Sequence, residues 1–162
     1  MSEALLKEGE EYAERIKAFL DSRQQPFTLE RFKSRSIFRY EIEHSDGPIQ
    51  VEILAKPFSD YFSLFAKAPV LVPEHSRAWF LSVLTGRTFS DSALRQEINL
   101  MTGEVRVGFS FLICPEWVTE KRLAKMIFSS ITMIEVLMGV IKGMSDEPRL
   151  LEAEDDGEDE PS

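Results

Sequence analysis

Residues 118–144 read VTEKRLAKMIFSSITMIEVLMGVIKGM, and the apolar pattern of this stretch decides what kind of fold to expect. At helical spacing, its apolar residues fall on two neighbouring stripes: Ile127, Ile131, Ile134, Met138 and Ile141 on one, and Leu123, Met126, Met133, Leu137, Val140 and Met144 on the other. Together the stripes are wider than the roughly 100° that one core-facing side of a helix needs. We therefore expect a long helix that is apolar on two faces.

Two interpretations of this helix remain open. In the first, it lies in a deep groove between a sheet and the first helix, so that both stripes are core. In the second, one stripe packs on the sheet and the other contacts a partner chain, with methionines favouring an adaptable surface. The candidate partner or dimer interface consists of Leu123, Met126, Ile127, Met133, Leu137 and Val140.

Charge is distributed unevenly along the chain. The 162 residues are 43% hydrophobic, which is enough for a folded core, and carry a net charge of −9. Residues 145–162 contain nine acidic residues and one arginine, so this segment alone contributes −8 and the remainder is close to neutral. We expect a single domain over residues 1–144 followed by a disordered acidic tail over residues 145–162.

The segments before the last helix indicate an α+β fold with a mostly antiparallel sheet. An amphipathic helix is expected over residues 3–21, and Ser45-Asp46-Gly47 is a hairpin turn signal. Alternating or continuous apolar patterns predict strands over residues 27–32, 36–44, 49–55, 61–68, 94–100 and 104–113, and a second helix begins at Pro73. The expected order is α-β-β-β-(β)-α-β-β-α.

The sequence contains no pattern typical of an enzyme or a metal site. Residues 103–108 have the glycine spacing of a phosphate-binding loop, but the lysine is missing and the segment lies within a predicted strand. Ser110 lacks the second glycine and the strand–turn–helix context of a nucleophile elbow. The two histidines, His44 and His75, and the single Cys114 are too scattered for a usual ligand set. We expect no catalytic residues, no metal and no cofactor.

A short basic and aromatic strip is the one candidate for binding an anionic partner. Within ten residues it contains four cations, three aromatic residues and no acid, and its candidate contact residues are Arg31, Lys33, Arg35, Arg39 and Tyr40. Such interleaving can bind phosphates and stacked bases, or an acidic protein segment such as the chain's own tail. The alternative is a solvated strand edge whose cations deter edge-to-edge pairing. Nucleic acid is the less favoured ligand because the folded body is not basic.

The expected location is the cytoplasm. One cysteine allows no disulfide within the chain, and the first residues lack the basic and apolar regions of a signal peptide. The apolar stretch 126–144 is interrupted by Glu135 and Lys142, both of which are costly in a bilayer. We therefore expect no membrane span.

This plan of elements resembles the YbjN-like domains, which in turn resemble the type III secretion chaperone fold. The resemblance covers roughly residues 5–143 and rests on the entry to the second helix at Pro73, the hairpin around residues 101–104 and the amphipathic helix after Cys114-Pro115. It implies a non-enzymatic cytoplasmic protein, a homodimer, that binds another polypeptide and has no catalytic residues. The expected function is thus a chaperone-like or regulatory adaptor with an unidentified protein client. The alternative is nucleic-acid or acidic-ligand binding through residues 31–40.

Overall fold

A computed structural model describes residues 3–32, 35–56, 61–87, 93–112 and 115–146. Its centre is a six-stranded antiparallel sheet. The strands are β1 (Thr28–Phe32), β2 (Arg35–Ile42), β3 (Ile49–Lys56), β4 (Tyr61–Leu71), β5 (Arg95–Ile98) and β6 (Glu104–Leu112). Their order in the sheet is β1-β2-β3-β4-β6-β5, so β1 and β5 are the edges. The predicted α+β class is confirmed, with four strands before the second helix.

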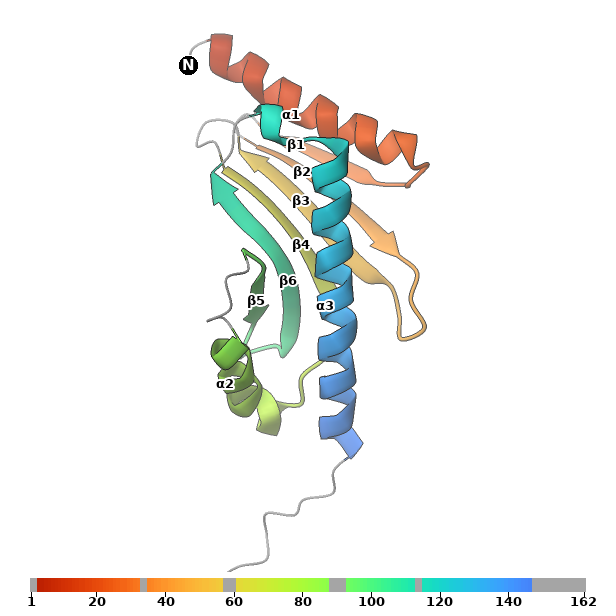
Figure 1. The fold of residues 1–162 in the computed structure, drawn as a ribbon, viewed down its shortest axis with the longest axis vertical. Helices are drawn as coiled ribbons and strands as arrows, with labels where there is room; N and C mark the ends of the chain where they lie inside the picture. The colour runs from red at the N-terminus through yellow and green to blue at the C-terminus, as the bar shows by residue number, and fades with distance from the viewer. Residues whose placement is uncertain (1–2, 33–34, 57–60, 88–92, 113–114, 147–162) are drawn as a thin grey trace, which may run out of the picture.

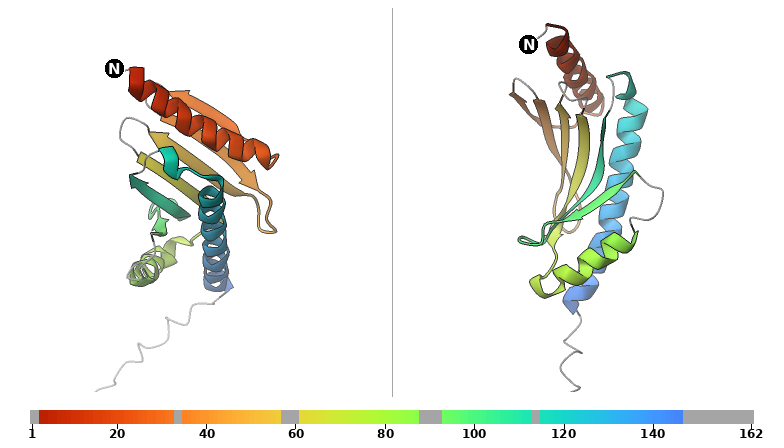
Figure 2. Two further views of the ribbon diagram at one scale, coloured as in Figure 1. Left: turned by 45° about the horizontal axis from the view of Figure 1, so that its top comes forward. Right: turned by 90° about the vertical axis from the view of Figure 1, so that its left-hand side faces the viewer.

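Two of the three helices cover one face of this sheet. The helices are α1 (Glu3–Ser22), α2 (Arg77–Arg87) and α3 (Glu120–Asp146), with single turns η2 (Glu74–Ser76) and η3 (Pro115–Trp117). α1 lies across one end of the sheet, while α3 runs down across it (Figure 1). Seen from the side, both helices lie on the same side of the sheet, and α2 lies at the far end beside β5 (Figure 2). Within the described residues, no helix covers the opposite face, which we call the open face.

The core lies between the sheet and these helices because alternate residues of each strand point inward. In the strand register, Phe38 of β2 is paired with Ile53 of β3, which is paired with Leu64 of β4. All three side chains are fully buried, and Tyr12 and Ile16 of α1 belong to the same core cluster. Each such side chain contributes about 1.5–3 kcal/mol by leaving water.

Glycines make the two predicted hairpin turns. Gly47 and Gly103 have φ values of 113° and 80°, a region that other residues rarely adopt. Gly103 is also close to the chain before α2, because a Cβ placed on it would lie 2.4 Å from the carbonyl oxygen of Val72. Both turns lie where the sequence predicts them.

The boundaries of α3 agree with the prediction at one end only. The Thr119 hydroxyl oxygen accepts a hydrogen bond from the backbone N–H of Arg122 at 3.3 Å, as expected of an N-cap. At the other end, the stretch predicted to form the helix ends at Met144, whereas α3 continues to Asp146. The predicted disordered tail therefore begins inside the helix, and its residues 147–162 lie outside the described residues.

Candidate interaction surfaces

The structure revises the predicted interface on α3. Leu123 and Leu137 are 1% and 0% exposed and belong to the core, so the folded chain does not present them to a partner. The other four residues predicted for the interface are partly buried and pack against the same core: Met126, Ile127, Met133 and Val140. Both stripes therefore face the rest of the chain, because α3 packs against β4, β6 and α1 together. This is the groove arrangement of the first interpretation.

The solvent side of α3 is formed by a different set of residues, which we call the outer stripe. Its members are Lys121, Lys125, Phe128, Thr132, Val136, Gly139 and Gly143, all exposed. At about 100° per residue, they lie within a sector about 80° wide on the helix surface. Phe128 and Val136 are 71% and 47% exposed. Sequence reasoning missed this stripe because its apolar residues are few compared with those of the two buried stripes.

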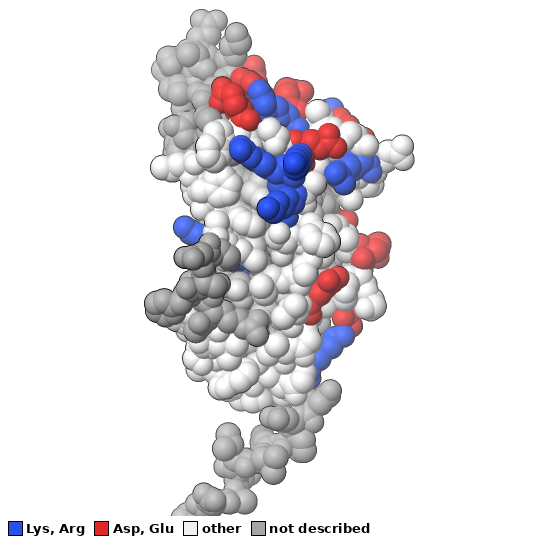
Figure 3. Space-filling view, viewed as in Figure 1, with Lys and Arg blue, Asp and Glu red and all other residues white. Residues whose placement is uncertain are grey.

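A second exposed apolar surface lies on α2, and we call it the α2 face. Trp79 and Leu81 are 56% and 39% exposed and, at about 100° per residue, lie at the two borders of this exposed side, while Phe80 and Leu84 on the opposite side are buried. Between Arg77 and Arg87 the helix has no charged residue. The exposed members of the α2 face are Ala78, Trp79, Leu81, Ser82 and Thr85. Figure 3 shows positive side chains gathered near the start of α3 and a broad uncharged area below them, towards α2.

Arg77 attaches the beginning of α2 to the neighbouring turn. Its guanidinium donates hydrogen bonds to the backbone carbonyls of Val72, Leu100 and Met101, at 3.2, 3.1 and 2.8 Å. These bonds join the segment before α2 to the turn between β5 and β6. The α2 face is therefore held in a defined position relative to the sheet.

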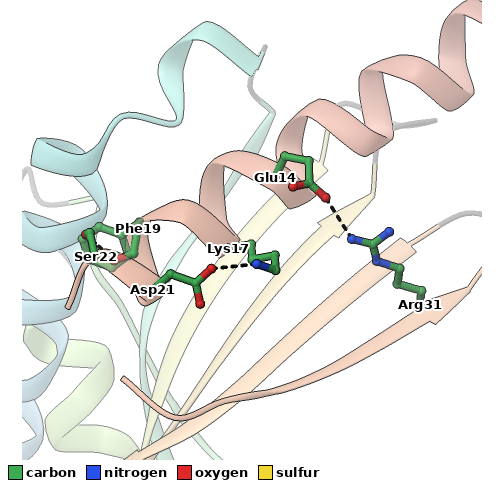
Figure 4. Close-up of polar contacts among 6 residues, drawn as sticks. All are labelled: Glu14, Lys17, Phe19, Asp21, Ser22 and Arg31. Carbon is green, nitrogen blue, oxygen red and sulfur yellow. Dashed lines mark hydrogen bonds and ion pairs between the residues drawn. The ribbon is translucent and has the colours of Figure 1, made fainter. Parts of the chain in front are cut away.

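The basic strip predicted at residues 31–40 is divided between the two faces of the sheet. The guanidinium of Arg31 lies 3.1 Å from the carboxylate of Glu14 on α1 (Figure 4). Arg39 lies on the open face, paired with Glu30 and, at 2.7 Å, with Glu52. Successive strand residues point to opposite faces, so consecutive cations and aromatics in the sequence do not form one surface.

The remaining members of the strip do not restore a ligand site. The Arg35 guanidinium stacks over the ring of Phe32 at 4.6 Å, and Lys33 lies outside the described residues. Phe38 and Tyr40 are 0% and 6% exposed, so neither ring is available to stack on a base. The prediction that Tyr40 contacts an anionic partner is wrong, because that side chain belongs to the core.

The buried Tyr40 gives a prediction for alkaline conditions. Burial raises the pKa of the Tyr40 hydroxyl above its ordinary value because the tyrosinate would lose its hydration. The folded state therefore resists deprotonation, and this contribution to stability is complete below pH 10 and is lost as pH rises above that value. We expect the free energy of unfolding in urea to fall as the pH rises from 10 to 11, by at most about 1.4 kcal/mol per pH unit. Tyr40→Phe should flatten this decline, and an equally steep decline in that variant would contradict the assignment.

The open face of the sheet has paired charges over a shallow concavity of about 960 Å³. Its lining includes Arg39, Glu52, Phe65, Lys67 and Arg106. Glu97 of β5 pairs with Arg106, whose guanidinium also lies 4.6 Å from the centre of the Phe65 ring. Lys67 pairs with Glu104 and thereby lowers the pKa of that carboxyl group. Each of these cations already has an acidic partner, so the concavity is not a cationic site waiting for an anion.

The Ser110 hydroxyl and the His44 imidazole could take part in catalysis only with a suitable partner. Ser110, on the open face, shares a 2.5 Å hydrogen bond with the Tyr61 hydroxyl, and neither residue is a base that would activate the other at neutral pH. The imidazole of His44 lies by the turn between β2 and β3, where Asp46 is its nearest acidic neighbour. Among the described residues, no group of three histidine, cysteine or acidic residues is placed to hold a metal ion.

By length and composition, the stretch Glu120–Met144 could cross a membrane. That is weak evidence, since core helices of soluble proteins have the same properties. In the structure this helix packs across β4 and β6, with Ile134 and Leu137 fully buried. Its two apolar stripes thus have a partner within the chain.

Comparison with known proteins gives no relative of this chain. It matches no protein-family model, no curated protein and no solved structure. The resemblance to YbjN-like domains and to the type III secretion chaperone fold stays a prediction.

Proposed function

We propose that this protein is a non-enzymatic protein-binding module, a chaperone-like or regulatory adaptor that acts as a homodimer in the cytoplasm. The observation that carries the proposal is the α2 face, where Trp79 and Leu81 are exposed on a helix without charged residues between its ends. The centres of protein interfaces are depleted in charge and enriched in aromatic residues, and tryptophan is prominent among the residues that dominate binding energy.

The way in which α2 is attached supports the same function. The three carbonyl contacts of Arg77 hold the helix before any partner arrives, so little ordering is needed on binding. The outer stripe of α3 is a separate exposed surface on the same chain. One surface is thus available for a client and another for a second copy, as a dimeric adaptor requires. The alternative, nucleic-acid or acidic-ligand binding through residues 31–40, has less support, because that strip is divided between two faces of the sheet.

Photochemical cross-linking in the native host tests the client surface. A photoreactive amino acid placed at Trp79 should form light-dependent adducts with a second polypeptide. The same group placed at Glu41, exposed on β2, is the matched control and should form far fewer. Equal adduct yields at the two positions, or no adduct at either, would contradict binding at the α2 face.

Once a client has been captured, a double substitution measures how much the α2 face contributes to the affinity for that client. Trp79→Ser with Leu81→Ser should leave the fold intact, because both side chains are exposed. It should weaken client binding at least tenfold, corresponding to about 1.4 kcal/mol, as measured by titration calorimetry. Unchanged affinity in a folded double variant would place the client elsewhere.

A further inference from the structure

The outer stripe of α3 contains two exposed glycines inside a helix, and the chain itself gives no packing reason for them. Gly139 and Gly143 are one turn apart, and a Cβ placed on either would meet nothing within 4 Å. Glycine is a poor helix former, and exposed helix positions are ordinarily filled by better ones. Small residues at this spacing allow another chain to approach the helix backbone closely. A second feature of the helix gives an indication of which chain approaches.

That indication is the distribution of charge along the same stripe. Lys121 and Lys125 lie in its N-terminal third, where Figure 3 shows positive side chains gathered. The opposite end of the helix has the negative end of the helix dipole, and residues 146–160 add nine acidic side chains against one arginine. About 38 Å of helix separates Lys121 from Asp146, at 1.5 Å per residue. The two ends of α3 therefore differ in charge, so the helix is complementary in charge to its own reversed copy.

We infer that the outer stripe of α3 pairs antiparallel with the outer stripe of a second copy, about a two-fold axis at Thr132. This inference rests on the proposed homodimer and specifies its interface. Positions equally far from Thr132 then meet, so Phe128 contacts Val136 of the other copy. By the same symmetry, Lys125 crosses Gly139 and Lys121 crosses Gly143.

The pairing gives each feature of the stripe a physical role. The exposed Phe128 and Val136 leave water at two equivalent contacts beside the axis. The glycines leave room for the aliphatic stems of the two lysines, whose ammonium groups then lie beside the partner's helix C-terminus. Because the stripe is self-complementary, the contact is isologous and closes as a dimer instead of continuing as a fibre.

Two charged residues that flank the stripe are already engaged within the chain. The Lys142 ammonium lies 2.5 Å from the Asp46 carboxylate, in the turn between β2 and β3. The Glu135 carboxylate is directed towards His44 in the same turn, at 3.9 Å. Both therefore lie towards that turn, to one side of the proposed contact.

Cysteine cross-linking tests the antiparallel geometry directly. In a Cys114→Ser background, Thr132→Cys should form a disulfide-linked dimer, because the two copies of position 132 meet at the axis. Gly143→Cys alone should not cross-link, since its two copies lie about 33 Å apart. A mixture of Gly143→Cys and Lys121→Cys chains should cross-link to each other. The antiparallel pairing would be overturned if Gly143→Cys cross-linked to itself, or if Thr132→Cys formed no disulfide-linked dimer.

Analytical ultracentrifugation of the full chain tests the contact itself. Phe128→Glu should raise the dimer dissociation constant at least about 30-fold while the circular dichroism spectrum is retained. Met101→Glu, at an 85% exposed position on the β5–β6 turn, is the matched control and should leave it unchanged.

The remaining outcomes separate this inference from the proposed function. A dimer that withstands Phe128→Glu overturns the α3 pairing and leaves the homodimer standing. A wild type that is monomeric at all concentrations overturns both the pairing and the homodimer, whereas client binding at the α2 face is tested separately. A monomer whose outer stripe instead binds lipid vesicles, with binding lost in Phe128→Glu, would assign the stripe to a membrane surface and overturn the pairing.

Discussion

Gly108→Ala is expected to destabilise the fold by at least about 3 kcal/mol, a large share of the 5–15 kcal/mol that stabilises a typical domain. Gly108 lies in the middle of β6, beside β4. A Cβ placed on it would lie 1.9 Å from the Leu64 carbonyl oxygen and 2.7 Å from the Phe65 Cα. Both atoms belong to the backbone of a central strand, so no rotation of a side chain can relieve the contact. The pairing of β4 with β6 would have to open.

Urea unfolding followed by circular dichroism measures this effect, and α3 supplies the control. Gly143→Ala meets open space and should raise the stability of the dilute monomer by about 0.5–1 kcal/mol, because alanine is the better helix former. The same chemical change thus has opposite expected signs at the two positions. A Gly108→Ala variant as stable as wild type would show that β4 and β6 are not packed at this distance.

The helices, most strands and both hairpin turns could be predicted because their signals are local. The alternation through β3 and the turn at Gly47 each depend on residues within a few positions of one another. Gly108 shows the limit of such signals. Its spacing from Gly103 first resembles a phosphate-binding loop, whereas its role is to let two strands approach closely, which depends on Leu64 forty-four positions earlier.

The interaction surfaces were less predictable because periodicity does not say what lies on each side of an element. Two apolar stripes on α3 are compatible with a partner or with a groove, and only the position of the sheet and α1 distinguishes them. The prediction that residues 31–40 form one basic surface was wrong for a related reason. Its residues are neighbours in sequence, but alternation along a strand sends Arg39 to the open face and Tyr40 to the core.

Leu137→Glu and Val136→Glu are adjacent changes for which we expect opposite results. Leu137 is 0% exposed in the core under α3, whereas Val136 is 47% exposed on the outer stripe. A glutamate at position 137 would bury an unpaired carboxylate and remove a core side chain, at a cost of more than about 4 kcal/mol. We expect that variant to lose its cooperative thermal transition.

In the dilute monomer, the free energy of unfolding of Val136→Glu in urea should lie within about 0.5 kcal/mol of wild type, since the side chain at position 136 is in water there. Its dimer should nevertheless dissociate more readily, because the new charge would lie against Phe128 of the second copy. The pair of variants thus separates stability from association at neighbouring positions. A folded, monomeric Leu137→Glu variant would restore Leu137 to an interface and contradict the groove arrangement. An unfolded Val136→Glu variant would mean that the outer stripe is covered within the chain, leaving no surface there for a second copy.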